Sequence, residues 1–102
     1  MASEKAFENK IKKHLKDRGC WFVKYWAGSP YTKSGVPDLL CCIGGTFVAI
    51  EVKAKGGKPS ELQLYNIDKI NKAGGVALTL WPDEWDTFIR LVDELLKGGK
   101  RQ

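Results

Sequence analysis

Residues 35–54, GVPDLLCCIGGTFVAIEVKA, decide the fold of this chain. Two apolar stretches, DLLCCI at 38–43 and TFVAIEVKA at 46–54, are separated only by Gly44-Gly45. A glycine pair adopts the positive φ angles that a two-residue hairpin turn needs, and apolar stretches flanking such a pair are typical of strands. We therefore expect two neighbouring antiparallel strands joined by this turn.

Working outward from the hairpin, the sequence predicts a second set of elements on either side. Phe7, Ile11 and Leu15 recur at helical spacing between a Ser3 cap and Gly19. The expected elements are a helix at 3–19, strands at 20–26, 38–43 and 46–54, a helix from Ser60 to the Gly74-Gly75 pair, a strand at 76–81, and a helix capped by Asp83. The fold class is α/β with the order αβββαβα, in which a helical crossover makes the last strand pair of the mixed four-stranded sheet parallel.

Length and charge limit the organisation and the partners. The chain has 102 residues, which suits one domain, expected here over residues 1–97 with a polar tail at 98–102. Its net charge is +5, and residues 1–60 hold eleven Lys or Arg against five acids. This basic half favours a polyanionic partner. No glycine-rich phosphate loop opens a helix, so we expect no nucleotide cofactor.

Cysteine usage and hydropathy indicate the compartment. Cys20, Cys41 and Cys42 cannot all pair within one chain, and their spacing does not match a zinc site. We expect Cys41 and Cys42 to be small buried side chains. The sequence lacks a signal peptide, and no apolar run approaches the roughly 20 residues of a membrane span, so we expect a cytoplasmic protein without a membrane partner.

The hairpin also carries the residues with the clearest chemistry. Side chains alternate along a strand, so Glu51 and Lys53 share one face, and the turn brings Asp38 toward them. Two buried carboxylates repel one another unless a cation compensates, and hard oxygen ligands favour Mg²⁺ or Mn²⁺, with the backbone carbonyl of Val52 as a third ligand. Lys53 would assist water attack on a phosphodiester. A structural salt bridge between Lys53 and one of the acids is the alternative.

These residues resemble the signature of the PD-(D/E)xK nuclease superfamily, present here as Pro37-Asp38 and Glu51-Val52-Lys53. Together with the GVPD turn and Ser60-x-x-Gln63, they look like the small stand-alone VRR-NUC family, which resembles Holliday junction resolvases. The resemblance covers most of the chain and implies a restriction-endonuclease-like core, divalent-metal cleavage of branched DNA, and a homodimer. The resemblance implies that Asp38 and Glu51 bind metal and that Lys53 is catalytic. It also implies that Gln63 holds a water or phosphate, although a solvated helix residue is an equally good interpretation of Gln63.

A further acid is expected on the first helix. Phe7-Glu8 resembles the aromatic-Glu pair of the archaeal junction resolvases, whereas Ser3-Glu4 resembles the opening of many VRR-NUC sequences. On the helical wheel Glu8 borders the buried stripe and Glu4 lies one turn below, so either can point inward. We favour Glu8 as the catalytic acid and keep Glu4 as an additional candidate. The reason is that Glu4 lies in the first turn, where an acid interacts favourably with the helix dipole without any catalytic role.

Several surface residues are candidates for DNA or self-association. The expected DNA contacts are Lys24, Tyr31, Lys33, Lys55 and Lys58. Trp81, Pro82 and Trp85 form either a hydrophobic cap on the sheet or a dimer surface. His14 falls beside the apolar stripe of the first helix and is expected to pack there.

Two function classes follow from these residues. The first is a metal-dependent structure-selective DNA endonuclease that hydrolyses phosphodiesters of branched DNA such as four-way junctions. A nuclease acting on linear duplex or DNA ends is its nearest rival within the enzyme class. The second class is a non-catalytic nucleic-acid-binding module, which the acids facing the phosphate argue against.

Overall fold

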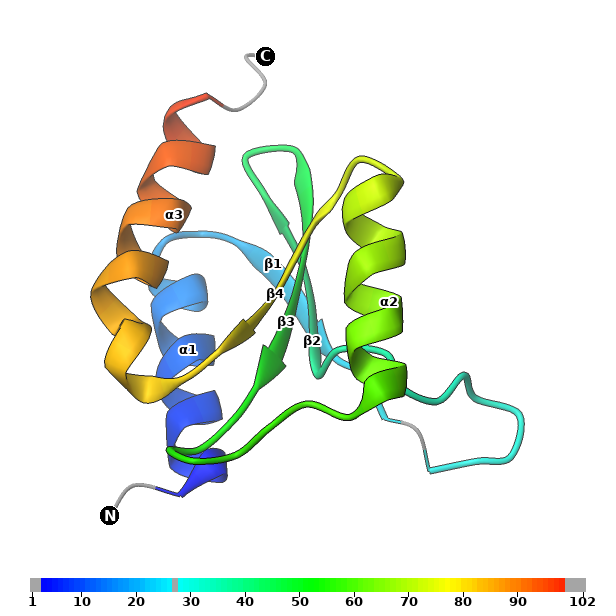
Figure 1. Ribbon diagram of the computed structural model, residues 1–102. Helices are drawn as coiled ribbons and strands as arrows, with labels where there is room; N and C mark the ends of the chain where they lie inside the picture. The colour runs from blue at the N-terminus through cyan, green and yellow to red at the C-terminus, as the bar shows by residue number, and fades with distance from the viewer. Residues whose placement is uncertain (1–2, 27, 99–102) are drawn as a thin grey trace.

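The computed structural model describes residues 3–26 and 28–98, and Figure 1 shows their arrangement. The outer residues of the predicted tail, 99–102, lie outside this part. The elements in chain order are α1 (Glu4–Asp17), β1 (Trp21–Lys24), β2 (Leu39–Ile43), β3 (Thr46–Val52), α2 (Glu61–Lys72), β4 (Val76–Leu80), a 3₁₀ turn η1 (Pro82–Glu84) and α3 (Trp85–Lys97).

The sheet confirms the predicted topology. Its strand order is β1-β2-β3-β4, with antiparallel pairing between the first three strands and parallel pairing between β3 and β4. The crossover through α2 produces the parallel pair. The strands are shorter than expected, so Asp38 lies just before β2 and Lys53 just after β3. Both candidate site residues therefore sit at the end of the sheet opposite the hairpin turn.

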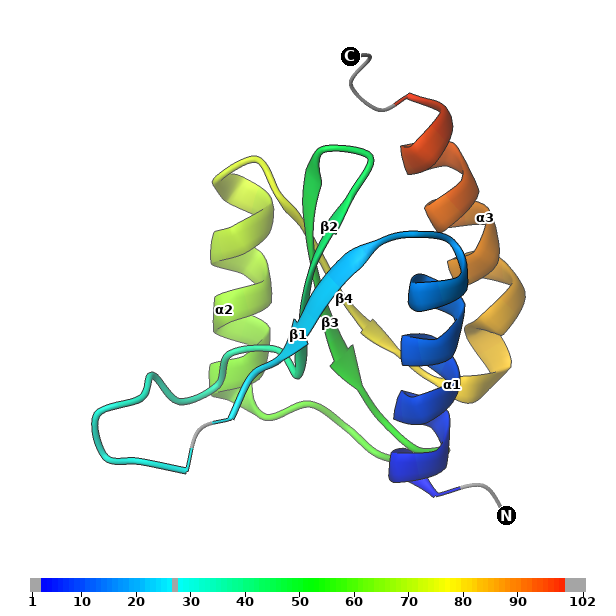
Figure 2. The same ribbon diagram turned by 180° about the vertical axis from the view of Figure 1, so that it is seen from behind.

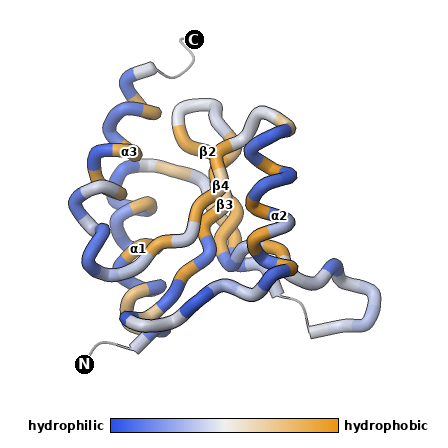
Figure 3. The backbone as a smooth tube through the Cα atoms, viewed as in Figure 1, coloured by the Kyte–Doolittle hydropathy of each residue, from blue (hydrophilic) through white to orange (hydrophobic). Residues whose placement is uncertain are grey.

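The helices cover the two faces of the sheet unequally. Figures 1 and 2 show α1 and α3 together on one face and α2 on the other. Apolar segments gather along the strands, as the hydropathy colouring of Figure 3 shows. The core cluster consists of Phe7, Ile11, Leu15, Leu39, Cys41, Ile43, Val48, Ile50, Val52, Leu80, Phe88 and Val92. Most of the apolar stabilisation thus lies between the sheet and the α1–α3 pair.

The hairpin turn has the backbone that its sequence predicts. Gly44 and Gly45 have φ angles of 58° and 83°, which a two-residue turn of the mirror-image type requires at both positions. Gly44 also lies against α3, because a Cβ built on it would be 2.0 Å from the carbonyl oxygen of Leu95. Glycine is needed at this position for both conformation and space.

The first two helix starts are confirmed and the third is not. The Ser3 hydroxyl accepts a hydrogen bond from the N–H of Ala6, and the Ser60 hydroxyl accepts one from the N–H of Gln63. Asp83, by contrast, lies inside the 3₁₀ turn, and Glu84 is the residue before α3. Pro82 starts the turn because its φ angle and missing N–H suit a first helical position, and α3 begins one residue later than the Asp83 cap predicts.

The aromatic cluster after β4 is a hydrophobic cap. Trp85 makes edge contacts with Phe7 at 6.2 Å and with His14 at 5.6 Å between ring centroids. The Trp81 indole N–H donates to the carbonyl of Gly57 at 2.7 Å. These contacts support the cap. The alternative of a self-association surface stays a prediction, because Trp81 and Trp85 remain partly exposed. His14 packs among aromatic rings, as expected.

The neighbouring cysteines have different environments. Cys41 is buried in the core, where burial raises the pKa of its thiol to about 12. Cys42 is exposed, so the expectation of two buried side chains is wrong for this residue. Adjacent strand residues face opposite ways, so Cys42 lies on the face of the sheet opposite the buried Cys41. In the described part of the chain, no helix is long and apolar enough to span a membrane.

Candidate metal-binding and catalytic site

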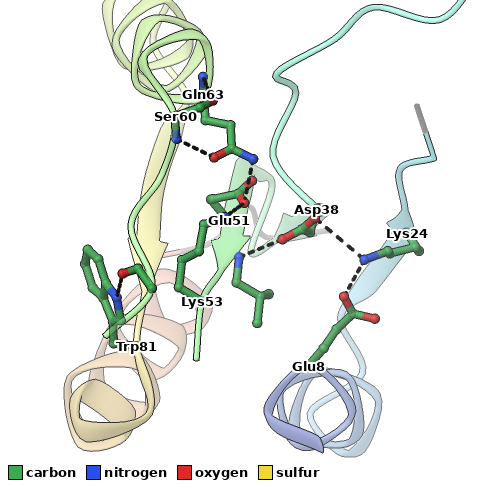
Figure 4. A network of polar contacts seen from close by, with 10 residues as sticks. Glu8, Lys24, Asp38, Glu51, Lys53, Ser60, Gln63 and Trp81 are labelled. Atoms are coloured by element: carbon green, nitrogen blue, oxygen red, sulfur yellow. Dashed lines mark hydrogen bonds and ion pairs between the residues drawn. The ribbon is translucent and has the colours of Figure 1, made fainter. Parts of the chain in front are cut away.

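The sheet register brings the two hairpin acids together. Leu39 lies opposite Ile50, so the next residues outward are Asp38 and Glu51. One carboxylate oxygen of Asp38, Oδ2, accepts a hydrogen bond from the backbone N–H of Val52 at 2.9 Å. Figure 4 shows both acids facing the same region beyond the strand ends. The predicted convergence of these carboxylates is present.

Glu51 is a buried carboxylate with one oxygen in use and one without a partner. Its side chain is 2% exposed, and Oε2 lies 3.1 Å from the Lys53 ammonium and 2.9 Å from the Gln63 amide nitrogen. Oε1 is also buried and has no hydrogen-bond partner. Burial, followed by the charge of Asp38, raises the pKa of Glu51 to about 7, although Lys53 acts in the opposite direction.

Gln63 is held in place by the start of α2. Its Oε1 accepts a hydrogen bond from the Ser60 N–H at 2.7 Å, while its Nε2 donates to Glu51. The amide therefore completes a capping box and orients a site carboxylate with its two ends. This dual role was missed from the sequence, although Ser60-x-x-Gln63 has the capping-box spacing. It also means that the side chain is not freely solvated.

The first helix contributes Glu8 rather than Glu4. Glu8 is 4% exposed and pairs with Lys24 and, at 3.0 Å, with Lys12. Burial opposes ionisation of Glu8, but the hydrogen bonds from Lys24 and Lys12 outweigh it and lower the pKa. Glu4 is exposed in the first turn, so the expectation that either acid can point inward is wrong for Glu4. Its place in that turn suits the helix dipole.

Lys24 connects Glu8 to the hairpin acids. Its ammonium contacts Glu8 Oε1 and lies 3.6 Å from Asp38 Oδ1, with the side chain 20% exposed. The two carboxylates raise the pKa of Lys24 even though burial alone would lower it. We expected this lysine among the phosphate contacts. The structure places it inside the carboxylate network (Figure 4), where it pairs with Glu8 of α1, and its contact with DNA phosphate stays a prediction.

The family of this chain follows from a comparison with known proteins. A sequence model described as archaeal Holliday junction resolvase matches residues 2–82. The chain belongs to this family. Neither the curated proteins nor the solved structures that were searched contain a match to it. The matched range includes α1, the whole sheet and α2, and therefore all the residues of the network described above, whereas α3 lies beyond it.

Archaeal Holliday junction resolvases are metal-dependent endodeoxyribonucleases that bind branched DNA and cleave four-way junctions. The resolvase described here is thus a structure-selective endonuclease of the PD-(D/E)xK superfamily. The expected enzyme class and substrate class are confirmed at this level. The match does not extend to the VRR-NUC family that the sequence also resembles.

The resolvase site has the chemistry that a divalent cation requires. Within residues 3–26 and 28–98, no three acids, histidines or cysteines form a complete metal cage. Asp38 and Glu51 nevertheless supply oxygen ligands side by side, and the partnerless Oε1 of Glu51 is the polar atom that a cation would satisfy. Hard oxygen donors suit Mg²⁺ and Mn²⁺. The residues therefore fit the metal that the resolvase family uses.

The remaining DNA-contact candidates lie on the surface of the resolvase. Lys33, Lys55 and Lys58 are exposed, and Tyr31 is 96% exposed in the loop between β1 and β2. They are not part of the carboxylate network. No pocket was found in the described part of the chain. Of the two hairpin acids, the Asp38 side chain is 23% exposed, whereas Glu51 is buried.

Proposed function

We propose that the resolvase hydrolyses a phosphodiester at the end of the β2–β3 hairpin, with Asp38, Glu51 and the backbone carbonyl of Val52 holding one Mg²⁺ or Mn²⁺ ion. The observation that carries this proposal is the buried Oε1 of Glu51, which has no partner while Oε2 has two. A buried carboxylate oxygen left unsatisfied costs about 1–3 kcal/mol, so a cation at this atom would remove a penalty.

When bound, the cation neutralises charge at the phosphate and promotes ionisation of the attacking water. Lys53 is the proposed catalytic lysine. Its ammonium lies 3.1 Å from Glu51 Oε2, close enough to hydrogen-bond the attacking water and to stabilise charge developing on the phosphate. Because the Lys53 side chain is only 16% exposed, bulk solvent screens this charge weakly.

Gln63 and Glu8 act around this centre. Gln63 keeps Oε2 of Glu51 occupied through a 2.9 Å hydrogen bond, which leaves Oε1 as the free ligand atom. Glu8 holds the Lys24 ammonium beside Asp38, where it lies 3.6 Å from Oδ1 of the acid proposed to bind metal. We therefore assign Glu8 the role of the helical active-site acid and exclude the exposed Glu4.

DNA outside the reacting phosphate is proposed to contact the exposed side chains of Lys33, Lys55 and Lys58, with Tyr31 stacking at the branch point. Exposed lysines bind phosphates without reading sequence, which suits an enzyme that selects DNA structure. The GVPD turn, the EVK segment and Ser60-x-x-Gln63 support a closer relation to the stand-alone VRR-NUC nucleases within the same superfamily.

We further propose a homodimer formed through the face of the sheet that α2 leaves partly uncovered. Trp21 lies opposite Cys42, and Cys42 lies opposite Phe47, so the three form one row across the sheet. Trp21 is 62% and Phe47 46% exposed, and Tyr65 on α2 is 55% exposed. An apolar row of this kind is typical of an interface. Sedimentation should show a dimer that Trp21→Glu converts to a monomer.

Cleavage of matched DNA substrates tests the assignment. A four-way junction, a flap and a linear duplex are incubated with Mg²⁺ or Mn²⁺ and with the parent protein, Asp38→Asn, Lys53→Gln or the surface control Lys97→Gln, which alters an exposed lysine at the end of α3. We expect the first two variants to lose cleavage of the junction by about 100-fold or more while still binding it, because each removes one group of the chemical step. Lys97→Gln should cleave nearly as the parent does.

The same assay separates the alternative functions. A parent protein that binds the junction without cutting it would support the non-catalytic binding module. Faster cutting of linear duplex than of junction would support the end-processing nuclease. Full cleavage by Asp38→Asn would show that the metal ligands lie elsewhere.

A further inference from the structure

The loop between β1 and β2 is anchored at its base rather than free. The Tyr25 N–H donates to the carbonyl of Asp38 at 2.8 Å, and its hydroxyl donates to the carbonyl of Lys33 at 2.7 Å. The returning segment lies against α2, where the Asn66 amide donates to the carbonyl of Ser34 at 3.4 Å. The loop therefore leaves the sheet from a defined position at the same end as Asp38. Figures 1 and 2 show it extending away from α1 and α3, past the start of α2.

Trp26 is the second residue after β1 and stands beside the proposed active site. The Lys24 ammonium lies 5.3 Å from the centroid of the Trp26 ring and 3.6 Å from Asp38 Oδ1. Trp26 is thus separated from a proposed metal ligand by one side chain. Despite the contact with Lys24, it is 70% exposed. The chain leaves a large apolar ring in water beside its reaction centre, a position that packing of the core does not explain.

The Trp26 ring does not belong to the proposed dimer face. Lys24, which the ring contacts, is directed toward Glu8 on α1. Trp21 and Val23 are exposed on the alternate positions of β1 and pair with Cys42 and Leu40 on the opposite face of the sheet. The exposure of Trp26 therefore needs an explanation separate from self-association.

The chemistry of the loop suits a DNA base. Between Trp26 and Asp38 the sequence has one charged residue, Lys33, and it is basic. Exposed aromatic rings next to basic side chains bind single-stranded nucleic acid by stacking on bases, which needs no particular sequence. A base inside a duplex is already stacked on both faces, whereas a branch point offers bases that can be unstacked at lower cost. A ring beside the reacting phosphate would thus distinguish a branch from continuous duplex.

We propose that Trp26 is a specificity-determining residue that stacks on an unpaired or unstacked base of the strand to be cut, immediately beside the active site. This inference rests on the proposed location of that site at Asp38 and Glu51. Lys24 supports the ring from the side of the carboxylate network, so the same lysine links base recognition to the metal-binding acids.

Binding and fluorescence test the proposal without cleavage. Junctions carrying 2-aminopurine at the branch point, and linear duplexes with the same label, are titrated in EDTA with the parent, Trp26→Ala and Trp26→Phe. We expect Trp26→Ala to lose about 5- to 150-fold in junction affinity, together with the fluorescence change at the branch point. Its affinity for linear duplex should change by less than about twofold. Trp26→Phe should retain most of the junction affinity because it keeps an aromatic face.

Three results would overturn the proposal. One is an unchanged junction affinity for Trp26→Ala, and the second is an equal loss for junction and duplex, which indicates a general effect on phosphate contacts. The third is a change in sedimentation of Trp26→Ala, which assigns the ring to a protein interface. Asp38→Asn is tested in parallel. If Asp38→Asn still cleaves but the fluorescence change depends on Trp26, the active-site assignment fails while the stacking role stands.

Discussion

The two buried glutamates of the site should affect stability in opposite directions, and Glu51→Gln tests the more informative one. Burial and Asp38 raise the pKa of Glu51 from 4.5 to about 7. At about 1.4 kcal/mol per pKa unit, ionised Glu51 destabilises the metal-free protein by about 3 kcal/mol relative to the unfolded chain. Glutamine keeps the size and the hydrogen-bonding oxygen but cannot ionise. Glu51→Gln should therefore be more stable than the parent at pH 8 and lack cleavage activity.

The pH dependence gives the sign of the effect. An acid whose folded pKa is raised binds more protons in the folded state between the two pKa values, so the contribution of Glu51 to the stability of the parent falls as pH rises from 4.5 to about 7. Glu8 provides the matched control, because Lys24 and Lys12 lower its pKa against the effect of burial. Its contribution is present above pH 4.5 and is lost as pH falls through the lowered pKa. Glu8→Gln should therefore be less stable than the parent at neutral pH.

Urea unfolding in EDTA at intervals between pH 4 and pH 8 measures both variants against the parent. The difference in unfolding free energy between each variant and the parent cancels the other titrating groups. For Glu51→Gln this difference should grow with pH toward about 3 kcal/mol. If Glu51→Gln is instead less stable than the parent at pH 8, the ion pair with Lys53 outweighs the burial of the charge, and the case for a cation-binding oxygen at Glu51 is lost.

Three further substitutions and one control variant test the framework of the fold and the site. Ser60→Ala removes the cap of α2 and should lower the unfolding free energy by about 1 kcal/mol in urea titrations, whereas an unchanged value would show that the cap contributes nothing. Gly44→Ala places a side chain at a φ of 58°, with its Cβ 2.0 Å from the carbonyl oxygen of Leu95. It should therefore lower the unfolding free energy by about 1–3 kcal/mol or more. Gly28→Ala is the control, because a Cβ at this position meets no atom within 4 Å, and its unfolding free energy should change little. Equal losses of unfolding free energy in the two variants would contradict the steric role of Gly44. Burial and Arg18 lower the pKa of His14, so the contribution of His14 to stability is lost as pH falls below about 6.5, and His14→Phe should gain stability relative to the parent between pH 8 and pH 5 in thermal melts.

Local patterns were sufficient to predict most of the architecture. The Gly44-Gly45 pair specified the hairpin, and the alternation of Glu51 with Lys53 specified their common face, because both depend on backbone geometry within a few residues. The serine caps of the first two helices followed from the same kind of short-range signal. Strand ends were less predictable, since pairing stops where a partner strand ends rather than where apolar residues do.

The partners of the site residues depended on contacts between elements distant in the chain. The sequence placed Lys24 among surface cations, but packing of α1 against β1 puts it between Glu8 and Asp38. From the sequence, either Glu4 or Glu8 could point toward the core. The orientation of α1 against the sheet decides that Glu8 is the buried acid.

The sequence by itself therefore determined the order of the elements, the hairpin and the convergence of Asp38 with Glu51, since these follow from periods and turns of a few residues. The tertiary structure alone decided that Gln63 occupies one oxygen of Glu51 and that the other is buried without a partner. The physical reason is that burial and long-range hydrogen bonds depend on how α1 and α2 pack against the sheet. That packing is a property of the whole chain, and a local sequence pattern does not contain it.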